Sequence, residues 1–151
     1  RTPEVGNVDR GTIDSWNVFV ERRLPLDLAV SAGYVATATR GGYADINLNY
    51  AERGGNTARQ YFTQAGNANI LLWGSFAEAN YHSLQMALNR PFKNGLLLKG
   101  AYTWSKALNM VDDDGRAVVT WSQPSQFARN YAYAGYDRPH MLQLGFVYEL
   151  P

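Results

Sequence analysis

Hydrophobic and polar residues alternate along five segments of the chain, and the spacing of an amphipathic helix is almost absent. Alternation with a period of two is the pattern of a β-strand that has one apolar and one polar face. The clearest example is Leu26 to Thr39, where the even positions are Leu, Val, Ala or Tyr and most odd positions are small or polar. The pattern predicts an all-β fold of antiparallel, up-and-down strands over residues 12–24, 26–39, 70–92, 95–108 and 138–150.

The second face of these strands carries mostly Ser, Gly, Ala, Asn, Gln and Thr. A soluble sandwich turns such a face to bulk water and usually loads it with charged residues. Small uncharged residues suit the polar interior of a membrane barrel, whose apolar face meets lipid. The positions that would face lipid are Val18, Val20, Leu28, Val30, Leu84, Met86, Leu88, Leu96, Leu98, Leu142, Leu144 and Phe146.

Five aromatic residues lie on the apolar face, mostly near strand ends. They are Trp16, Tyr34, Tyr102, Trp104 and Tyr148. Membrane barrels carry girdles of aromatic residues at both membrane interfaces, which predicts that these side chains anchor the sheet there. The same residues would also suit the aromatic core of a soluble β-protein. On this pattern alone both interpretations stand.

Short and long connections alternate between the predicted strands. Residues 23–27 form one tight connection, and Asn94-Gly95 forms the other, because this pair supplies the positive φ values of a hairpin turn. Residues 40–69 and 109–137 form loops far longer than the ~2–5 residues usual between antiparallel strands. In an up-and-down barrel all short turns fall on one rim and all long loops on the other. Outer-membrane barrels have this asymmetry, with short periplasmic turns and long extracellular loops.

Composition removes several other classes of protein. No segment approaches the ~20 apolar residues of a membrane-spanning helix, whereas barrel strands of ~9–11 residues fit a mean hydropathy of −0.34. The absence of cysteine excludes disulfides and thiol chemistry. A net charge of +1 without a basic cluster predicts that the protein binds no nucleic acid.

No segment carries the residue spacing of a catalytic or metal-binding motif. His82 and His140 are far apart and share no carboxylate pattern. The run from Asp112 to Gly115 lacks the spacing of a calcium loop, which favours a solvated loop tip. Arg40-Gly41-Gly42 and residues 53–56 favour flexible loops over phosphate sites, because no helix begins after a strand there. We therefore expect a protein that is not an enzyme and that holds no metal or cofactor.

The predicted loop over residues 109–137 is rich in aromatic residues, which are the best candidates for contact with a ligand. They are Trp121, Phe127, Tyr131 and Tyr133, with Tyr136 close behind. Long loops also pack on themselves, so the same side chains would equally suit a loop that closes over the barrel mouth. The sequence supports both interpretations.

A series of short motifs lies between residues 81 and 109. They are Tyr81, Leu84-Gln85, Arg90 with Phe92, Gly95-Leu96, and the run from Ala101 to Lys106. In this order the motifs resemble the barrel of TonB-dependent outer-membrane receptors, specifically the Oar-like branch. Parts of residues 15–35 and 136–151 also resemble that family. Pro91 and Pro139 depart from it, and because proline donates no hydrogen bond to a ladder, each predicts a strand end, a bulge or an edge.

The resemblance implies a location in the outer membrane of a diderm bacterium and a role in the uptake or passage of a ligand that it does not specify. It also implies four partners: outer-membrane lipid, the remainder of the barrel, a plug domain and the TonB complex. The plug domain and the TonB-contacting segment are absent from the given sequence, and five strands are too few for a barrel, whose smallest members have ~8. We therefore expect a partial barrel from a receptor.

Two alternatives to a transporter fit the same strands. One is a structural outer-membrane or cell-surface β-protein without a transport role. The other is a soluble β-sandwich that acts as a binding module and buries its apolar face against a second sheet.

Overall fold

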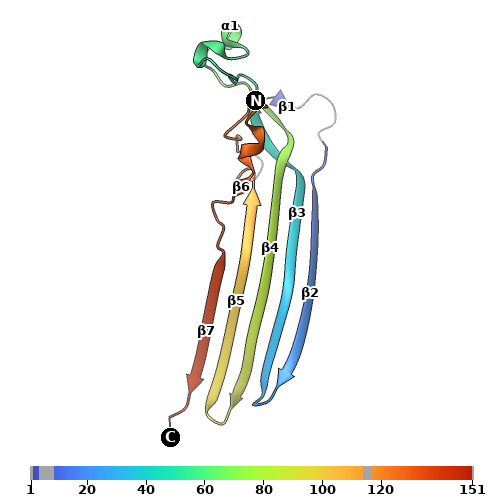
Figure 1. Ribbon diagram of the computed structural model, residues 1–151, viewed down its shortest axis with the longest axis vertical. Coiled ribbons are helices and arrows are strands. Elements are labelled where there is room, and N and C mark those ends of the chain that lie inside the picture. The colour runs from blue at the N-terminus through green and yellow to red at the C-terminus, as the bar shows by residue number, and fades with distance from the viewer. Residues whose placement is uncertain (1, 4–8, 114–116, 151) are drawn as a thin grey trace. The chain divides into compact units, whose positions relative to one another are not determined.

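The computed structural model describes residues 2–3, 9–113 and 117–150 and consists mainly of β-strands (Figure 1). The strands are β1 (Thr2–Pro3), β2 (Thr12–Leu24), β3 (Leu28–Asn47), β4 (Leu71–Lys93), β5 (Leu96–Asn109), β6 (Ala132–Tyr133) and β7 (His140–Tyr148). They form one sheet in the order β2-β3-β4-β5-β6, with β7 also paired to β5 and β1 paired to β4. This arrangement confirms the predicted all-β, antiparallel fold. None of the helices in the described part of the chain is long and apolar enough to cross a membrane.

The chain divides into two compact units, and the long strands β3, β4 and β5 contribute to both. Unit 1 comprises Arg1–Asp14, Ala38–Asn80 and Leu108–Tyr136, and unit 2 comprises Ser15–Thr37, Tyr81–Ala107 and Asp137–Pro151. Both short turns belong to unit 2 and both long loops belong to unit 1.

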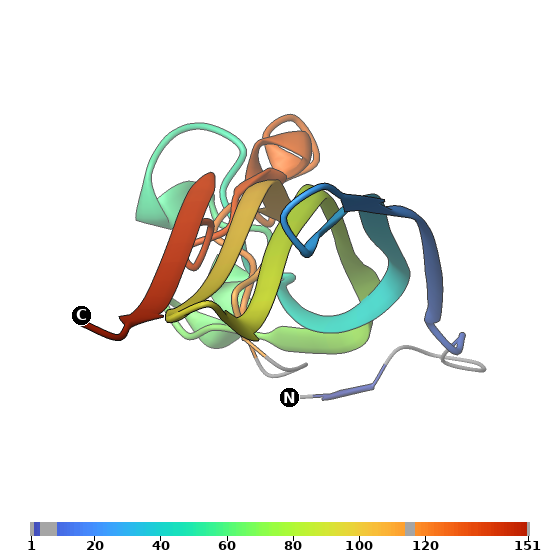
Figure 2. The same ribbon diagram turned by 90° about the horizontal axis from the view of Figure 1, so that it is seen from below.

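Unit 2 is a single layer of five strands in the order β2-β3-β4-β5-β7. Figure 2 looks at the turn-bearing ends of these strands from below, with β7 in red beside β5 in yellow. Every residue of β2 and β7 is exposed, and the described part of unit 2 contains no helix. No second layer of described residues covers either face, so this unit does not have the two packed sheets of a sandwich.

Positive φ angles shape both turns of unit 2. Asn94 and Gly95 have φ values of 51° and 75°, which confirms the Asn-Gly hairpin turn. In the other turn the positive φ values fall on Leu26 and Asp27, at 66° and 59°. Leucine rarely adopts this conformation, because its side chain crowds the backbone there. Strand β3 therefore begins at Leu28, two residues later than the alternation predicts.

The largest difference from the predicted strands lies in β3, which runs to Asn47 instead of ending at Thr39. Gly41 and Gly42 suggested a flexible loop, and that interpretation is wrong. Gly41 adopts a positive φ of 65° within the strand, and a Cβ added at Gly11 would lie 2.5 Å from the Gly41 carbonyl oxygen. The glycines thus permit a close approach between two backbones inside a continuous strand. The first long loop begins only at residue 48.

The remaining strand ends lie within two residues of the expected positions. Pro91 lies two residues before the end of β4, and Pro139 immediately precedes β7. These positions near strand ends are expected, because proline has no backbone N–H to donate to a ladder. The loops contain short helices that the pattern did not predict: η1 (Asn56–Ala58), α1 (Phe62–Ala65) and η2 (Phe127–Asn130). Residues 53–56 lie in the first loop as expected, with positive φ at Gly54 and Gly55.

Unit 1 contains a small apolar core. Ala44, Ala77 and Val119 are buried together, with Ile46, Val111 and Phe127 packed against them. The second long loop joins this core through a short parallel bridge, in which Asp45 N–H donates to the Ala117 carbonyl and Val119 N–H donates to the Asp45 carbonyl, each at 2.9 Å. The loop is therefore pinned to β3.

Two buried asparagines organise the long loops of unit 1. Asn49 is 0% exposed; its amide donates to the Gly66 and Ala68 carbonyls and its Oδ1 accepts from Tyr61 N–H. In the second loop Asn130 plays the same role, accepting from Trp121 N–H and donating to two carbonyls. Each amide satisfies backbone groups that have no partner in a strand ladder.

Candidate functional site

The pairing of β5 with β7 decides which side chains of unit 2 share a face. Residues directly opposite in a ladder point to the same side of the sheet. One face carries the pairs Leu96–Tyr148, Leu98–Phe146, Gly100–Leu144, Tyr102–Leu142 and Trp104–His140, and the other carries Leu97–Val147, Lys99–Gly145, Ala101–Gln143 and Thr103–Met141. We call the first the even-numbered face and the second the odd-numbered face. The residues that the alternation placed together in these two strands therefore lie in register.

The even-numbered face is apolar and uncovered. Leu144 and Phe146 are 70% and 73% exposed, and Val18 and Val20 on β2 are exposed to a similar degree. Six of the residues predicted to face lipid line one hollow of about 480 Å³ on this face: Val20, Val30, Met86, Leu88, Leu142 and Leu144. A continuous exposed apolar surface of this kind marks a site that meets a partner or a membrane.

Four of the other predicted lipid-facing residues, Leu28, Leu84, Leu96 and Leu98, are partly buried by their neighbours on the adjacent strands. This follows from their positions on β3, β4 and β5, each of which has a strand on both sides. The exposure is greatest on the two strands at the margins of unit 2.

The odd-numbered face of unit 2 carries small and hydrogen-bonding groups, together with Leu97, Met141 and Val147 at the pairing of β5 with β7. Ser83 is 2% exposed, its hydroxyl donates to the Val35 carbonyl, and it accepts from the Gln85 amide at 3.2 Å. Ser15 and Thr37 join their hydroxyls at 3.3 Å between β2 and β3. Polar side chains on this face are thus bonded to one another and to the backbone.

Phe19 is a large apolar residue at an odd-numbered position of β2, and its neighbour on β3 explains why it lies there. Its ring lies over Gly33 of the neighbouring strand, where an added Cβ would be 2.2 Å from the Phe19 Cδ1 atom. Glycine leaves the space that the ring occupies, and the ring covers the backbone that glycine exposes. Such aromatic–glycine pairs fix the register of neighbouring strands.

Two of the five predicted interface aromatics pair with histidines that sequence reasoning left without a role. The Tyr34 hydroxyl lies 2.6 Å from His82 Nδ1, and the Tyr102 hydroxyl lies 2.9 Å from His140 Nδ1, with the rings stacked in both pairs. Each pair joins neighbouring strands and gives the phenol a partner on an apolar face. Trp16, Trp104 and Tyr148 are exposed on the same unit. One sequence signal points to both histidines: each occupies an even position in a strand whose other even positions are mostly apolar, where a polar ring needs a hydrogen-bond partner.

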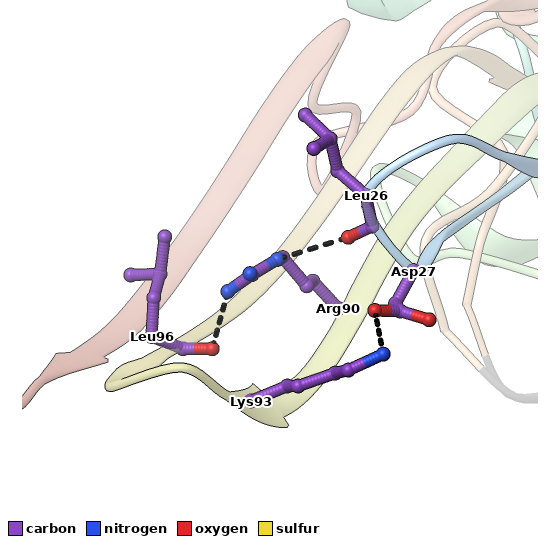
Figure 3. Close-up of polar contacts among 5 residues, drawn as sticks. All are labelled: Leu26, Asp27, Arg90, Lys93 and Leu96. Carbon is purple, nitrogen blue, oxygen red and sulfur yellow. Dashed lines mark hydrogen bonds and ion pairs between the residues drawn. The ribbon is translucent and has the colours of Figure 1, made fainter.

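The two short turns of unit 2 are fastened to each other (Figure 3). Arg90 Nε donates to the Leu26 carbonyl at 3.0 Å, and its Nη1 donates to the Leu96 carbonyl. The ammonium of Lys93 lies 2.6 Å from a carboxylate oxygen of Asp27. The hydrogen bond from Lys93 is the main reason why the pKa of the Asp27 carboxyl is lowered. These contacts compensate locally for the unfavourable backbone at Leu26.

The four aromatic residues proposed for ligand contact do not form one exposed patch. Phe127 packs on the apolar core of unit 1, and the Tyr131 hydroxyl accepts from the Asn80 amide at 2.6 Å. Trp121 lies under the Arg129 guanidinium, 5.5 Å from the ring centre. Tyr133 in β6 is 66% exposed. Much of this loop is therefore folded on itself, as the alternative interpretation of the sequence allows.

Asp112 holds the loop ends of unit 1 together. Its carboxylate accepts from the Asn109 amide at 2.8 Å and from Gly135 N–H at 3.0 Å. These hydrogen bonds, that from Asn109 first, lower the pKa of the Asp112 carboxyl. Asp114 and Gly115 of the predicted acidic tip lie outside the described residues. Within the described ranges, no three or more His, Asp or Glu side chains converge to hold a metal ion.

Comparison with known protein families gives a match over most of the chain. The family model described as "Outer membrane beta barrel domain" matches residues 5–151, which is nearly the whole chain. No curated protein and no solved structure matches the chain.

Proposed function

Because the chain belongs to the outer membrane beta barrel domain family, we propose that it forms part of the wall of a TonB-dependent receptor that passes a ligand across the outer membrane. The observation that carries the proposal is the two-sided single sheet of unit 2. Its exposed apolar face suits contact with lipid, and its hydrogen-bonded odd-numbered face suits a water-filled lumen. Family membership supports the outer-membrane location and removes the soluble sandwich from consideration.

The transport part of the proposal rests on the resemblance of residues 81–109 and their flanks to TonB-dependent receptors. By this resemblance the partners are the remainder of the barrel, a plug domain and the TonB complex, which supplies the energy for passage. The odd-numbered face of unit 2 is then the surface along which plug and ligand move. A wall of bonded Ser, Thr and Gln side chains suits that task, because it offers hydrogen-bonding groups along the path of a ligand.

The proposal is tested with the full-length protein in detergent and the purified periplasmic domain of TonB. We expect the two proteins to form a complex in a pull-down and by calorimetry. A trimeric porin, which does not use TonB, is the control and should not bind. If the protein is folded and does not bind the TonB domain, the proposal of a receptor is refuted. The remaining interpretation is then a structural outer-membrane barrel without a transport role.

A further inference from the structure

The hollow on the even-numbered face of unit 2 has a charged residue at its margin. We propose that this hollow binds one glycerophospholipid of the inner leaflet, with an acyl chain against the aliphatic side chains and the lipid phosphate at Arg22. The inference rests on the outer-membrane location of the family and not on the proposed transport. It adds a lipid-specific site to a surface that otherwise needs only generic contact with hydrocarbon.

The shape of the hollow follows from small residues on central strands. Ala32 and Gly100 lie among larger side chains, and all of them line the space of about 480 Å³. Gly100 forms part of the floor of the hollow: an added Cβ there would lie 3.1 Å from Leu144 Cδ2 and 3.7 Å from Leu88 Cβ, so the two leucines close in over the glycine backbone. The volume lies in the range of ligand pockets, ~300–1,000 Å³. Bilayer chains have to fill such a hollow, because an empty one forfeits dispersion contacts.

Arg22 gives the hollow its specificity. It is the charged residue in the lining, two positions from Val20 on the same side of β2. No hydrogen bond or ion pair engages its side chain within residues 9–113 and 117–150. Arg90 and Lys93, which also lie near the short turns, have partners there. Arg22 therefore has its donors available for a partner that the chain does not supply.

The chemistry of that partner is set by the position of Arg22. It lies two residues before the end of β2, next to a short turn, and short turns of outer-membrane barrels face the periplasm. At that depth the inner-leaflet phosphates are the anions within reach of a side chain on the lipid face. A planar guanidinium binds phosphate with two parallel hydrogen bonds, and its aliphatic stem can lie along the apolar wall. A phospholipid satisfies both parts of the site.

The test uses the full-length protein in nanodiscs of phosphatidylethanolamine and phosphatidylglycerol, with a trace of phosphatidylglycerol that carries a photoreactive acyl chain. Mass spectrometry then maps the cross-linked residues. We expect cross-links to concentrate on Met86, Leu88 and Leu144, and Arg22→Gln to lower them about tenfold, the range for a lost charged hydrogen bond. A photoreactive diacylglycerol, which lacks the phosphate, should label the hollow as weakly as the variant.

Arg23→Gln is the matched control, because it removes the same charge one residue further along β2 and does not line the hollow. It should leave the cross-linking unchanged, and heat-modifiable gel mobility shows that each variant is folded. Gly100→Leu adds a side chain to the lining of the hollow without changing the charge and should also reduce labelling. Equal labelling along the whole even-numbered face, or equal effects of Arg22→Gln and Arg23→Gln, would overturn the proposal. Such results would mean that Arg22 merely extends to interfacial water.

Discussion

Unit 1 and unit 2 bury their apolar side chains in different ways. Unit 1 gathers Ala44, Ala77 and Val119 into a core and satisfies its loop backbone with asparagine amides. Unit 2 leaves Leu144 and Phe146 more than two-thirds exposed and has no covering layer of described residues. A folded unit in water needs the first arrangement, whereas the second is stable only where hydrocarbon replaces the missing layer. One chain is therefore built for two solvents.

A cation introduced on either face of unit 2 should show the largest difference in stability between the two faces. Leu144→Arg places a cation on the face expected to meet lipid, and it should destabilise the full-length protein in vesicles by about 2–4 kcal/mol if the position is near the bilayer centre. Gln143→Arg, the neighbouring residue on the odd-numbered face, should change stability far less. Unfolding by urea in lipid vesicles measures both. Equal losses would contradict the assignment of lipid to the even-numbered face.

The asparagine amides of unit 1 predict the next largest effect. Asn49→Ala removes three hydrogen bonds from a fully buried site, and it should destabilise the first loop by about 1–3 kcal/mol because backbone groups of Tyr61 and Gly66 lose their partner. Limited proteolysis within residues 48–70 gives the readout. Asn67→Ala, an exposed position in the same loop, is the control. Unchanged protease resistance in the Asn49 variant would show that the loop does not depend on this amide.

The aromatic–glycine pair of unit 2 should respond to a single methyl group. Gly33→Ala forces the Phe19 ring away and should lower stability by about 1–3 kcal/mol, as overpacking does. Gly145→Ala is the matched control, since an added Cβ there meets nothing within 4 Å. Adding Phe19→Ala to the Gly33 variant should restore part of the loss, and thermal unfolding of the three proteins compares them. A loss that persists undiminished in the double variant would locate the strain elsewhere.

The ion pair between the short turns predicts the smallest effect. The pKa of Asp27 is lowered by Lys93, so its contribution to stability is present above the ordinary carboxyl value of 3.8 and declines as the pH falls through the lowered value. Both side chains are about half exposed, which keeps the contribution small. Asp27→Asn should therefore reduce the difference between the free energies of unfolding at pH 7 and at pH 3. An unchanged difference in unfolding midpoint would exclude Asp27 as a source of the acid sensitivity.

The alternation predicted the parts of the fold that depend on local sequence. Strand β2 and the Asn94-Gly95 turn follow from period and turn chemistry, and they agree with the structure. The extension of β3 was missed because glycines at 41 and 42 look like breakers in isolation. They fit a strand only because the Gly11 backbone approaches there, a contact between distant segments that periodicity does not contain.

The candidate surfaces could also be predicted only as far as the local sequence determines them. The tyrosines at 34 and 102 were placed by alternation, but their histidine partners emerge only once neighbouring strands are in register. Phe127 illustrates the opposite case, because composition marks a loop aromatic without showing whether it points outward or into a core. Burial of this kind depends on the long-range bridge at Asp45 and not on the local sequence.

The exposed margin of β2 has a practical consequence for anyone who produces this segment. In the described residues the strand is paired along one side only, by β3, and its 13 residues are all exposed. Its other side presents a row of unpaired amide and carbonyl groups beside exposed valines, a template on which further copies can add strands. Preparations of the segment on its own should therefore assemble into ribbons in which copies pair edge to edge. A peptide with the sequence of the turn-side end of β2 should inhibit that assembly.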